Sequence, residues 1–155
     1  MPTSDLPPAP PVPPSARAAT IALREVAEVS KEFESHVQRE LTVNPTDLAA
    51  MEHLIMSGPL GPAELARRLG ISRPAMTASV DRLTALGHAT RGQHPTDRRG
   101  VVVTAAPASV ARAMGVLLPM IADVDSALDG FTEHEQQVIA EYLERVIAAY
   151  RRQLD

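Results

Sequence analysis

The sequence contains no cysteine, and this absence removes several kinds of chemistry from consideration. Without a thiol the chain has no disulfide, no thiolate metal site and no cysteine nucleophile. We also find no apolar run long enough to span a bilayer, and no basic-then-apolar signal peptide at the N-terminus. A cytoplasmic location follows by default. A chain of 155 residues, 45% of them apolar, is expected to form one domain or two small modules that share a core.

Patterns for catalysis and for metal binding are missing as well. The sequence has no glycine-rich phosphate loop and no serine in a nucleophile-elbow pattern. Acidic pairs such as Glu32 with Glu34 do not share a helix face, and no two of the five histidines lie four residues apart. We therefore expect neither an enzyme nor a metal or other cofactor. A zinc site assembled from separate helices is the alternative.

Basic residues are concentrated in one segment of an acidic chain. The whole chain carries 15 basic and 19 acidic residues, a net charge of −4, but residues 64–100 hold seven arginines against three acidic residues. The segments on either side each hold four basic and eight acidic residues. Because DNA affinity comes largely from neutralising phosphates, the local excess favours a DNA-binding surface. A solvated charged surface is the alternative that charge alone leaves open.

A proline-rich tail and two helices are predicted before this segment. Residues 1–14 contain seven of the 14 prolines, which predicts a disordered or polyproline-like tail, or a ligand for a partner domain. From Ser15 to about Glu40, apolar residues recur at three- and four-residue steps, as in a helix. Asn44 and Pro45 then cap and open a second helix, which ends near Gly58.

Two shorter helices and a hairpin are predicted in the basic segment. Residues 62–69 form the first helix, and Ser72 caps a longer one over about 73–86. The buried stripe of the longer helix consists of Met76, Val80 and Leu83. Strands are expected over 88–91 and 101–104, joined by a turn-rich loop. A helix-turn-helix places its second helix in a DNA groove, and a basic hairpin beside it can reach the neighbouring groove.

Two long helices are predicted at the C-terminal end. The first begins at Pro107 and carries apolar residues at alternating four- and three-residue steps, a seam suited to packing against another long helix. Pro119 is expected to bend it and Gly130 to break it. Thr132 and Glu135 form a capping box for the last helix. Together these helices carry more apolar surface than one small domain covers, which predicts a partner chain.

The order of these elements and two motifs resemble the MarR family of winged helix-turn-helix regulators. The stretch ELARRLGISRPAMTASVDRLTALGHATR looks like the family's helix-turn-helix, and PTDRRGVVV looks like its wing. The resemblance covers nearly everything after the tail and implies a mainly α fold with a two-stranded β wing. The implied parts are a dimerisation helix over 15–43, a winged helix-turn-helix domain over 44–105 and dimerisation helices over 106–155.

The resemblance also implies a function. Family members form homodimers through the terminal helices and place one recognition helix per subunit in successive major grooves. We therefore expect a homodimeric, sequence-specific transcriptional regulator, a ligand-responsive repressor that binds a pseudo-palindromic DNA operator. The alternative is a winged-helix dimer that binds protein and has little or no DNA affinity. Short side chains favour that alternative, since Ala78 stands where many members carry a long basic residue.

The residues expected to contact DNA come from the recognition helix and the wing. They are Ser72, Arg73, Pro74, Ala75, Thr77, Ala78, Arg82, Arg91, His94, Arg98 and Arg99. Arginine suits phosphates and narrow minor grooves, and small apolar side chains can touch thymine methyls. Asp97 is expected to orient Arg99 or a helix arginine. For Arg82 and Arg91, an ion pair with Asp81 or with a wing residue is an equally good interpretation.

A small anionic or aromatic effector is expected to bind beside the DNA-binding surface. The residues assigned to it are His36, His53, Arg82 and Arg91. For the two histidines, surface or core positions without a ligand are the alternative. Thiol oxidation is excluded as the signal because there is no cysteine.

Overall fold

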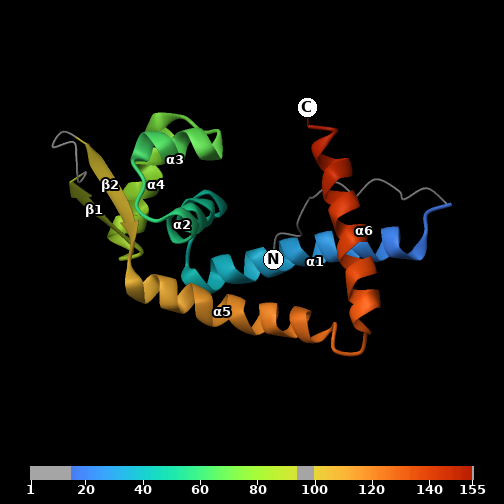
Figure 1. The fold of residues 1–155 in the computed structure, drawn as a ribbon. Coiled ribbons are helices and arrows are strands. Elements are labelled where there is room, and N and C mark those ends of the chain that lie inside the picture. Colours follow the sequence, from blue (N-terminus) through green and yellow to red (C-terminus); the bar gives the residue numbers. More distant parts are fainter. Residues whose placement is uncertain (1–14, 94–99, 155) are drawn as a thin grey trace, which may run out of the picture. The chain divides into compact units, whose positions relative to one another are not determined.

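The structure, a computed structural model, describes residues 15–93 and 100–154. It contains six helices and one two-stranded sheet in the described residues (Figure 1). The chain divides into two compact units, Met1–Ala106 and Pro107–Asp155. The predicted tail over residues 1–14 lies outside the described residues, as do the wing-loop residues His94, Asp97, Arg98 and Arg99.

The first helix leaves most of its apolar side chains exposed. Helix α1 (Ala18–Leu41) begins three residues later than the sequence predicted and ends at Thr42, which takes the left-handed conformation. Val37 and Leu41 are buried near its C-terminal end. The large apolar side chains that stay exposed along α1 are Ile21, Val26 and Val29. The helical periodicity was therefore predicted correctly, but within one chain only the last turns of α1 are covered.

Helix α2 (Pro45–Ser57) begins as predicted. The Asp47 amide donates to the Asn44 side-chain oxygen at 2.9 Å, and Pro45 occupies the first turn, where its missing N–H costs little. The helix ends at Gly58, whose φ of 78° suits a residue without a Cβ. The apolar residues that α2 buries are Leu48, Ala50, Met51 and Leu54, while Ile55 is half-buried.

Two helices joined by a tight turn pack on α2. Helix α3 (Pro62–Leu69) ends at Gly70, which has a φ of 65°. The Ser72 hydroxyl then accepts the Ala75 amide at 3.3 Å and caps α4 (Arg73–Ala85). The predicted stripe of Met76, Val80 and Leu83 is fully buried. Together with Leu65 and Met51 these side chains form the core of the first unit, so α4 is fixed by its apolar face and presents its other face outward.

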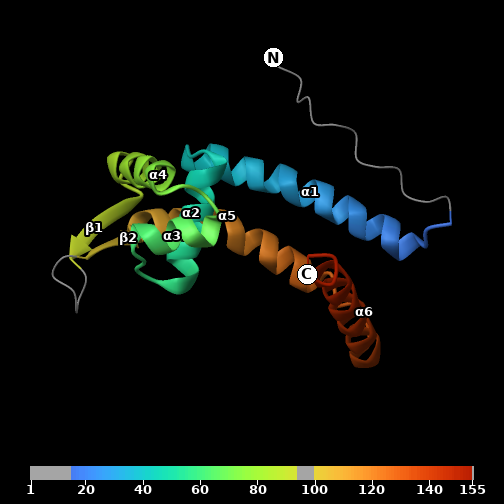
Figure 2. The same cartoon turned by 90° about the horizontal axis from the view of Figure 1, so that it is seen from above.

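A β-hairpin completes the first unit. Strands β1 (Ala89–Gln93) and β2 (Val101–Ala105) pair antiparallel, with Ala89 opposite Ala105. Strand β1 begins one residue later than predicted and continues two residues further toward the loop, while β2 is one residue longer at its other end, Ala105. Leu60 extends the sheet, since its N–H and C=O both bond to Val103 at 3.1 and 2.8 Å. Figures 1 and 2 show the hairpin projecting from the group of helices α2, α3 and α4.

The second unit consists of two long helices. Helix α5 (Pro107–Ser126) runs through Pro119 and ends before the predicted break at Gly130, in a series of turns. Helix α6 (Glu133–Arg151) has the predicted capping box: Thr132 N donates to Glu135 Oε2 at 2.8 Å, and Glu135 N donates to Thr132 Oγ1 at 3.3 Å. The large apolar side chains exposed on these helices are Leu118, Ile121, Val124, Val138, Leu143, Ile147 and Tyr150.

The apolar character of α5 corrects one expectation. In the described residues this helix is long and apolar enough to cross a membrane by length and composition, so the expectation that no run has that length was wrong. Length and composition alone do not make it a membrane span. An apolar helix that packs against a partner chain passes the same test.

Candidate nucleic-acid interface

The first two turns of α4 form an exposed surface next to the helix-turn-helix turn. The predicted contact residues in this part of the chain are all exposed, and they are Ser72, Arg73, Pro74, Ala75, Thr77 and Ala78. The Thr77 hydroxyl donates to the Arg73 carbonyl oxygen at 3.0 Å. Because its single proton is used within the helix, Thr77 can offer only oxygen lone pairs to a ligand. A base amino group is a suitable donor for them.

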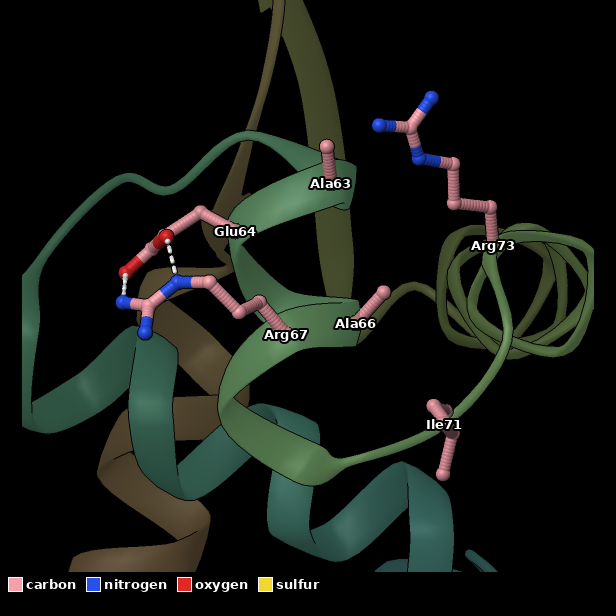
Figure 3. Close-up of a pocket in the computed structure, with 6 residues that line it drawn as sticks. All are labelled: Ala63, Glu64, Ala66, Arg67, Ile71 and Arg73. Carbon is pink, nitrogen blue, oxygen red and sulfur yellow. Dashed lines mark hydrogen bonds and ion pairs between the residues drawn. The ribbon is translucent and has the colours of Figure 1, made fainter.

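Arg73 carries an unpaired guanidinium at the N-terminal end of α4. Within the described residues its side chain makes no hydrogen bond or ion pair. Figure 3 shows it rising from the start of the helix and standing apart from the paired Glu64 and Arg67. An exposed cation at a helix N-terminus, where the helix dipole also favours negative charge, suits an anion such as a phosphate.

A hollow of about 560 Å³ lies between α3 and the start of α4. The residues that line it are Ala63, Glu64, Ala66, Arg67, Ile71 and Arg73 (Figure 3). Four of these residues come from α3, Ile71 belongs to the turn, and Arg73 is the first residue of α4. The hollow therefore belongs to the same surface as Arg73.

The two arginines of α3, Arg67 and Arg68, share the carboxylate of Glu64. Glu64 accepts from Arg67 at 2.7 and 2.9 Å and from Arg68 at 2.8 Å. These hydrogen bonds lower the pKa of Glu64 to about 2, so it stays ionised at neutral pH. Arg68 also donates to the Ser57 hydroxyl at 2.8 Å. The two cations and one anion leave a local charge of about +1, less than the sequence count suggests.

Arg82 is paired with a residue that the sequence analysis did not connect with it. Its Nε and Nη2 donate to Asp47 Oδ2 and Oδ1 at 2.9 and 2.7 Å. The hydrogen bond to Asp47 raises the pKa of Arg82. The ion pair foreseen for Arg82 is present, but its partner is on α2 and is neither Asp81 nor a wing residue.

Arg91 forms the ion pair with Asp81 that was one of the two interpretations for it. Its guanidinium on β1 pairs with the carboxylate of Asp81 on α4, and both side chains are partly exposed. The pair joins the wing to the recognition helix. Among the five described arginines in residues 64–100, Arg73 alone has no side-chain partner in the described part of the chain.

Asp47 and Ser79 are the polar residues of this region that sequence reasoning missed. Asp47 stands in the first turn of α2 and is only 1% exposed, and Ser79 on α4 is fully buried. A signal was present, because Asp47 precedes Met51 by four residues and Ser79 follows Met76 by three. Each polar residue therefore lies on the buried face of its helix, which suggests that the two faces meet.

The predicted effector residues are not brought together by direct contacts. His36 is exposed on α1, with its ring centroid 6.1 Å from that of Phe33, and His53 is half-buried on α2. In the described residues no hydrogen bond or ion pair joins either histidine to Arg82 or Arg91. His88, which was not among the predicted effector residues, is buried, and its Nε2 lies 2.8 Å from the Leu41 carbonyl oxygen.

The chain is similar to known regulators in sequence and in fold. A family model described as MarR family matches residues 41–100. An uncharacterized HTH-type transcriptional regulator of Bacillus subtilis (strain 168), named YcgE, is 31% identical over 111 residues, which is 72% of this chain and 72% of that one. A MarR-like transcriptional regulator from Thermotoga maritima has a TM-score of 0.67 at 24% identity and covers 88% of this chain and 98% of its own.

A second Thermotoga maritima transcriptional regulator gives a TM-score of 0.64 at 23% identity, over 88% of this chain and 96% of that one. The structural matches agree with the mainly helical fold and the two-stranded wing. These relatives are described as transcriptional regulators and not as enzymes. The chain belongs to the MarR family of transcriptional regulators, DNA-binding proteins of the winged helix-turn-helix type.

Proposed function

We propose that this protein is a homodimeric, sequence-specific DNA-binding repressor that acts in the cytoplasm, has no catalytic activity and responds to a small ligand. The observation that carries the proposal is the exposed start of α4, where the Arg73 side chain has no partner among the described residues. Ser72, Arg73 and the helix N-terminus contact phosphate, and Thr77 accepts from a base. Pro74, Ala75 and Ala78 lie close enough to the groove to touch thymine methyls.

The wing is the second DNA-contacting part of the proposal. Arg98 and Arg99 enter the minor groove, His94 adds a phosphate contact, and Asp97 orients an arginine. These four residues lie outside the described residues, so support comes from the hairpin that carries them. Its two strands are held together by the antiparallel pairing of β1 with β2.

Dimer formation is supported by apolar side chains that one chain leaves uncovered. They occur on α1, α5 and α6, where Val29, Ile121 and Ile147 are each about half-exposed. Soluble monomers rarely leave so many large apolar side chains in the open. A second copy of the chain covers them and sets the spacing of the two α4 helices on DNA.

The regulatory ligand in this proposal is a small anionic or aromatic molecule. His36 and His53 remain its proposed polar contacts, and Arg82 and Arg91 would have to exchange their present ion pairs for it. The ligand favours a spacing of the recognition helices that no longer fits successive major grooves. A panel of phenolic acids tests this by release of bound DNA, with mild peroxide as the contrasting treatment. Rapid release by peroxide alone, reversed by a reductant, would contradict a small-molecule signal.

The DNA-binding proposal is tested by titrating fluorescent duplexes from beside the protein's own gene at several salt concentrations. Arg73→Gln is expected to weaken binding to all duplexes and to lower the log–log salt slope by about one unit, because one phosphate contact is lost. Arg151→Gln removes the same charge from the end of α6 and serves as the matched control. Equal slopes for native protein and Arg73→Gln would remove Arg73 from the interface.

A dimeric protein-interaction module with little DNA affinity is the second candidate. It is favoured by the internal pairing of Arg67, Arg68, Arg82 and Arg91, which reduces the charge available to phosphate. The same titration separates the two candidates. Absence of binding by the native protein even at low salt would favour the interaction module.

A further inference from the structure

We propose that Asp47 is a positioning residue for DNA recognition: its buried carboxylate fixes α4 on α2 through Ser79 and Arg82, and thereby withholds the Arg82 charge from DNA phosphate. The inference rests on the proposed DNA-binding function. It assigns a role in that function to a residue of α2, a helix that lies beneath the recognition helix and presents no residue of the proposed DNA surface.

The Asp47 carboxylate is saturated with hydrogen bonds. Oδ1 accepts from Ser79 Oγ at 2.6 Å and from Arg82 Nη2 at 2.7 Å. Oδ2 accepts from Arg82 Nε at 2.9 Å and from Asn44 Nδ2 at 3.1 Å. Two of the three donor residues belong to α4, and they lie 32 and 35 residues away from Asp47 in sequence. The network is therefore a tertiary link between the two helices.

Burial makes this link sensitive to geometry. The Asp47 side chain is only 2% exposed, while that of Arg82 is 46% exposed. A buried carboxylate is tolerated only when its oxygens are fully paired, and a bidentate arginine pair requires both a defined distance and a defined plane. The apolar contacts of Met76, Val80 and Leu83 resist separation of the helices but specify their relative rotation less strictly. The polar network supplies that specification.

The position of α4 determines whether its DNA contacts can form. Ser79 lies in the middle of the helix and Arg82 in its last turn, whereas Arg73 and Thr77 lie in the N-terminal half. Since all four belong to one continuous helix, a rotation at Ser79 also moves Thr77. Hydrogen bonds to bases tolerate errors of only about 0.5 Å, so loss of the network is expected to affect sequence discrimination more than general DNA affinity.

The neighbouring ion pair provides a matched comparison. Asp81 precedes Arg82 in α4 and pairs with Arg91, but the Asp81 side chain is 58% exposed. Exposed pairs contribute little because water solvates both partners well. Asp81→Asn and Asp47→Asn each remove the carboxylate from one aspartate–arginine ion pair. The two carboxylates differ in burial, since that of Asp47 is buried and that of Asp81 is exposed.

The test measures affinity for an operator and for a scrambled duplex of equal length, each against salt, well below the melting temperature of each variant. Asp47→Asn, Arg82→Gln and the double variant are expected to lower the operator-to-scrambled affinity ratio about tenfold, the double no more than either single. Asp81→Asn should keep the native ratio. Arg82→Gln should also keep the native salt slope, whereas Arg73→Gln should lower it by about one unit.

Ser79→Ala keeps the test decisive if Asp47→Asn fails to fold. It removes one of the four hydrogen bonds and is expected to lower the affinity ratio about threefold. A native ratio in folded Asp47→Asn, or in Ser79→Ala when Asp47→Asn does not fold, would overturn the positioning role. A slope lowered by about one unit in Arg82→Gln at a native ratio would show instead that Arg82 contacts phosphate. Failure of the native protein to bind any duplex would overturn the DNA-binding function itself, and the inference with it.

Discussion

At the scale of single residues, charge counts in the sequence overestimate the charge that is available to a ligand. Seven arginines within residues 64–100 predicted a strongly basic surface. Of the five that the structure describes, Arg67 and Arg68 share Glu64, while Arg82 and Arg91 are bound to Asp47 and Asp81. Both pairs join residues from different elements, which local spacing does not specify: Asp81 was named as a possible partner of either arginine, and Asp47 of neither.

A substitution at Thr77 separates recognition of DNA bases from binding to DNA phosphates. Thr77→Ala removes the proposed acceptor for a base and is expected to weaken operator binding about three- to tenfold, with little change on scrambled DNA. Thr77→Ser keeps the hydroxyl and serves as the control. Fluorescence anisotropy on both duplexes measures the effect. Equal weakening on operator and scrambled DNA would place Thr77 outside base recognition.

At the scale of secondary-structure elements, local signals predicted most of the fold. Caps at Asn44, Ser72 and Thr132 and the turn at Gly70 placed the starts and ends of helices within a few residues. These signals work because each cap satisfies backbone groups of its own helix. The end of α5 was predicted less well: the helix ends at Ser126, before the predicted break at Gly130. The turns that follow depend on backbone hydrogen bonds, which no single residue type in the sequence indicates.

The capping box of α6 gives a prediction at this scale. Thr132→Ala removes the side-chain acceptor for the Glu135 amide and is expected to lower the free energy of unfolding by about 1 kcal/mol. Thr132→Ser retains a hydroxyl and should stay close to native. Chemical denaturation followed by circular dichroism measures both variants. An unchanged denaturation midpoint for Thr132→Ala would show that the N-terminal cap of α6 does not contribute to the measured transition.

At the scale of the whole molecule, the sequence predicted that the terminal helices need a partner, and the structure supports this with exposed apolar side chains. What covers those side chains was not predictable from periodicity alone. A heptad-like seam fits a second copy of the chain and any other long helix equally well. Membership of the MarR family favours the second copy.

Ile147 on α6 tests dimer formation in solution. Ile147→Glu places a charge on an apolar side of the helix and is expected to weaken the dimer about tenfold or more. Ala148→Glu adds the same charge on the opposite side of the helix, at an exposed position, and is the control. Sedimentation at a series of concentrations gives the dissociation constant. A native constant for Ile147→Glu would exclude this part of α6 from the dimer interface.

The measurement that tests the central claim most directly is selection of the native protein's binding sites from a pool of random duplex DNA. A dimer that places one α4 helix in each of two successive major grooves predicts enrichment of a pseudo-palindrome with half-sites about 10 base pairs apart, centre to centre. The selection uses native protein and requires no knowledge of the regulated gene. Recovery of sequences that share no motif, at a salt concentration where the protein still binds, would contradict sequence-specific recognition by this fold.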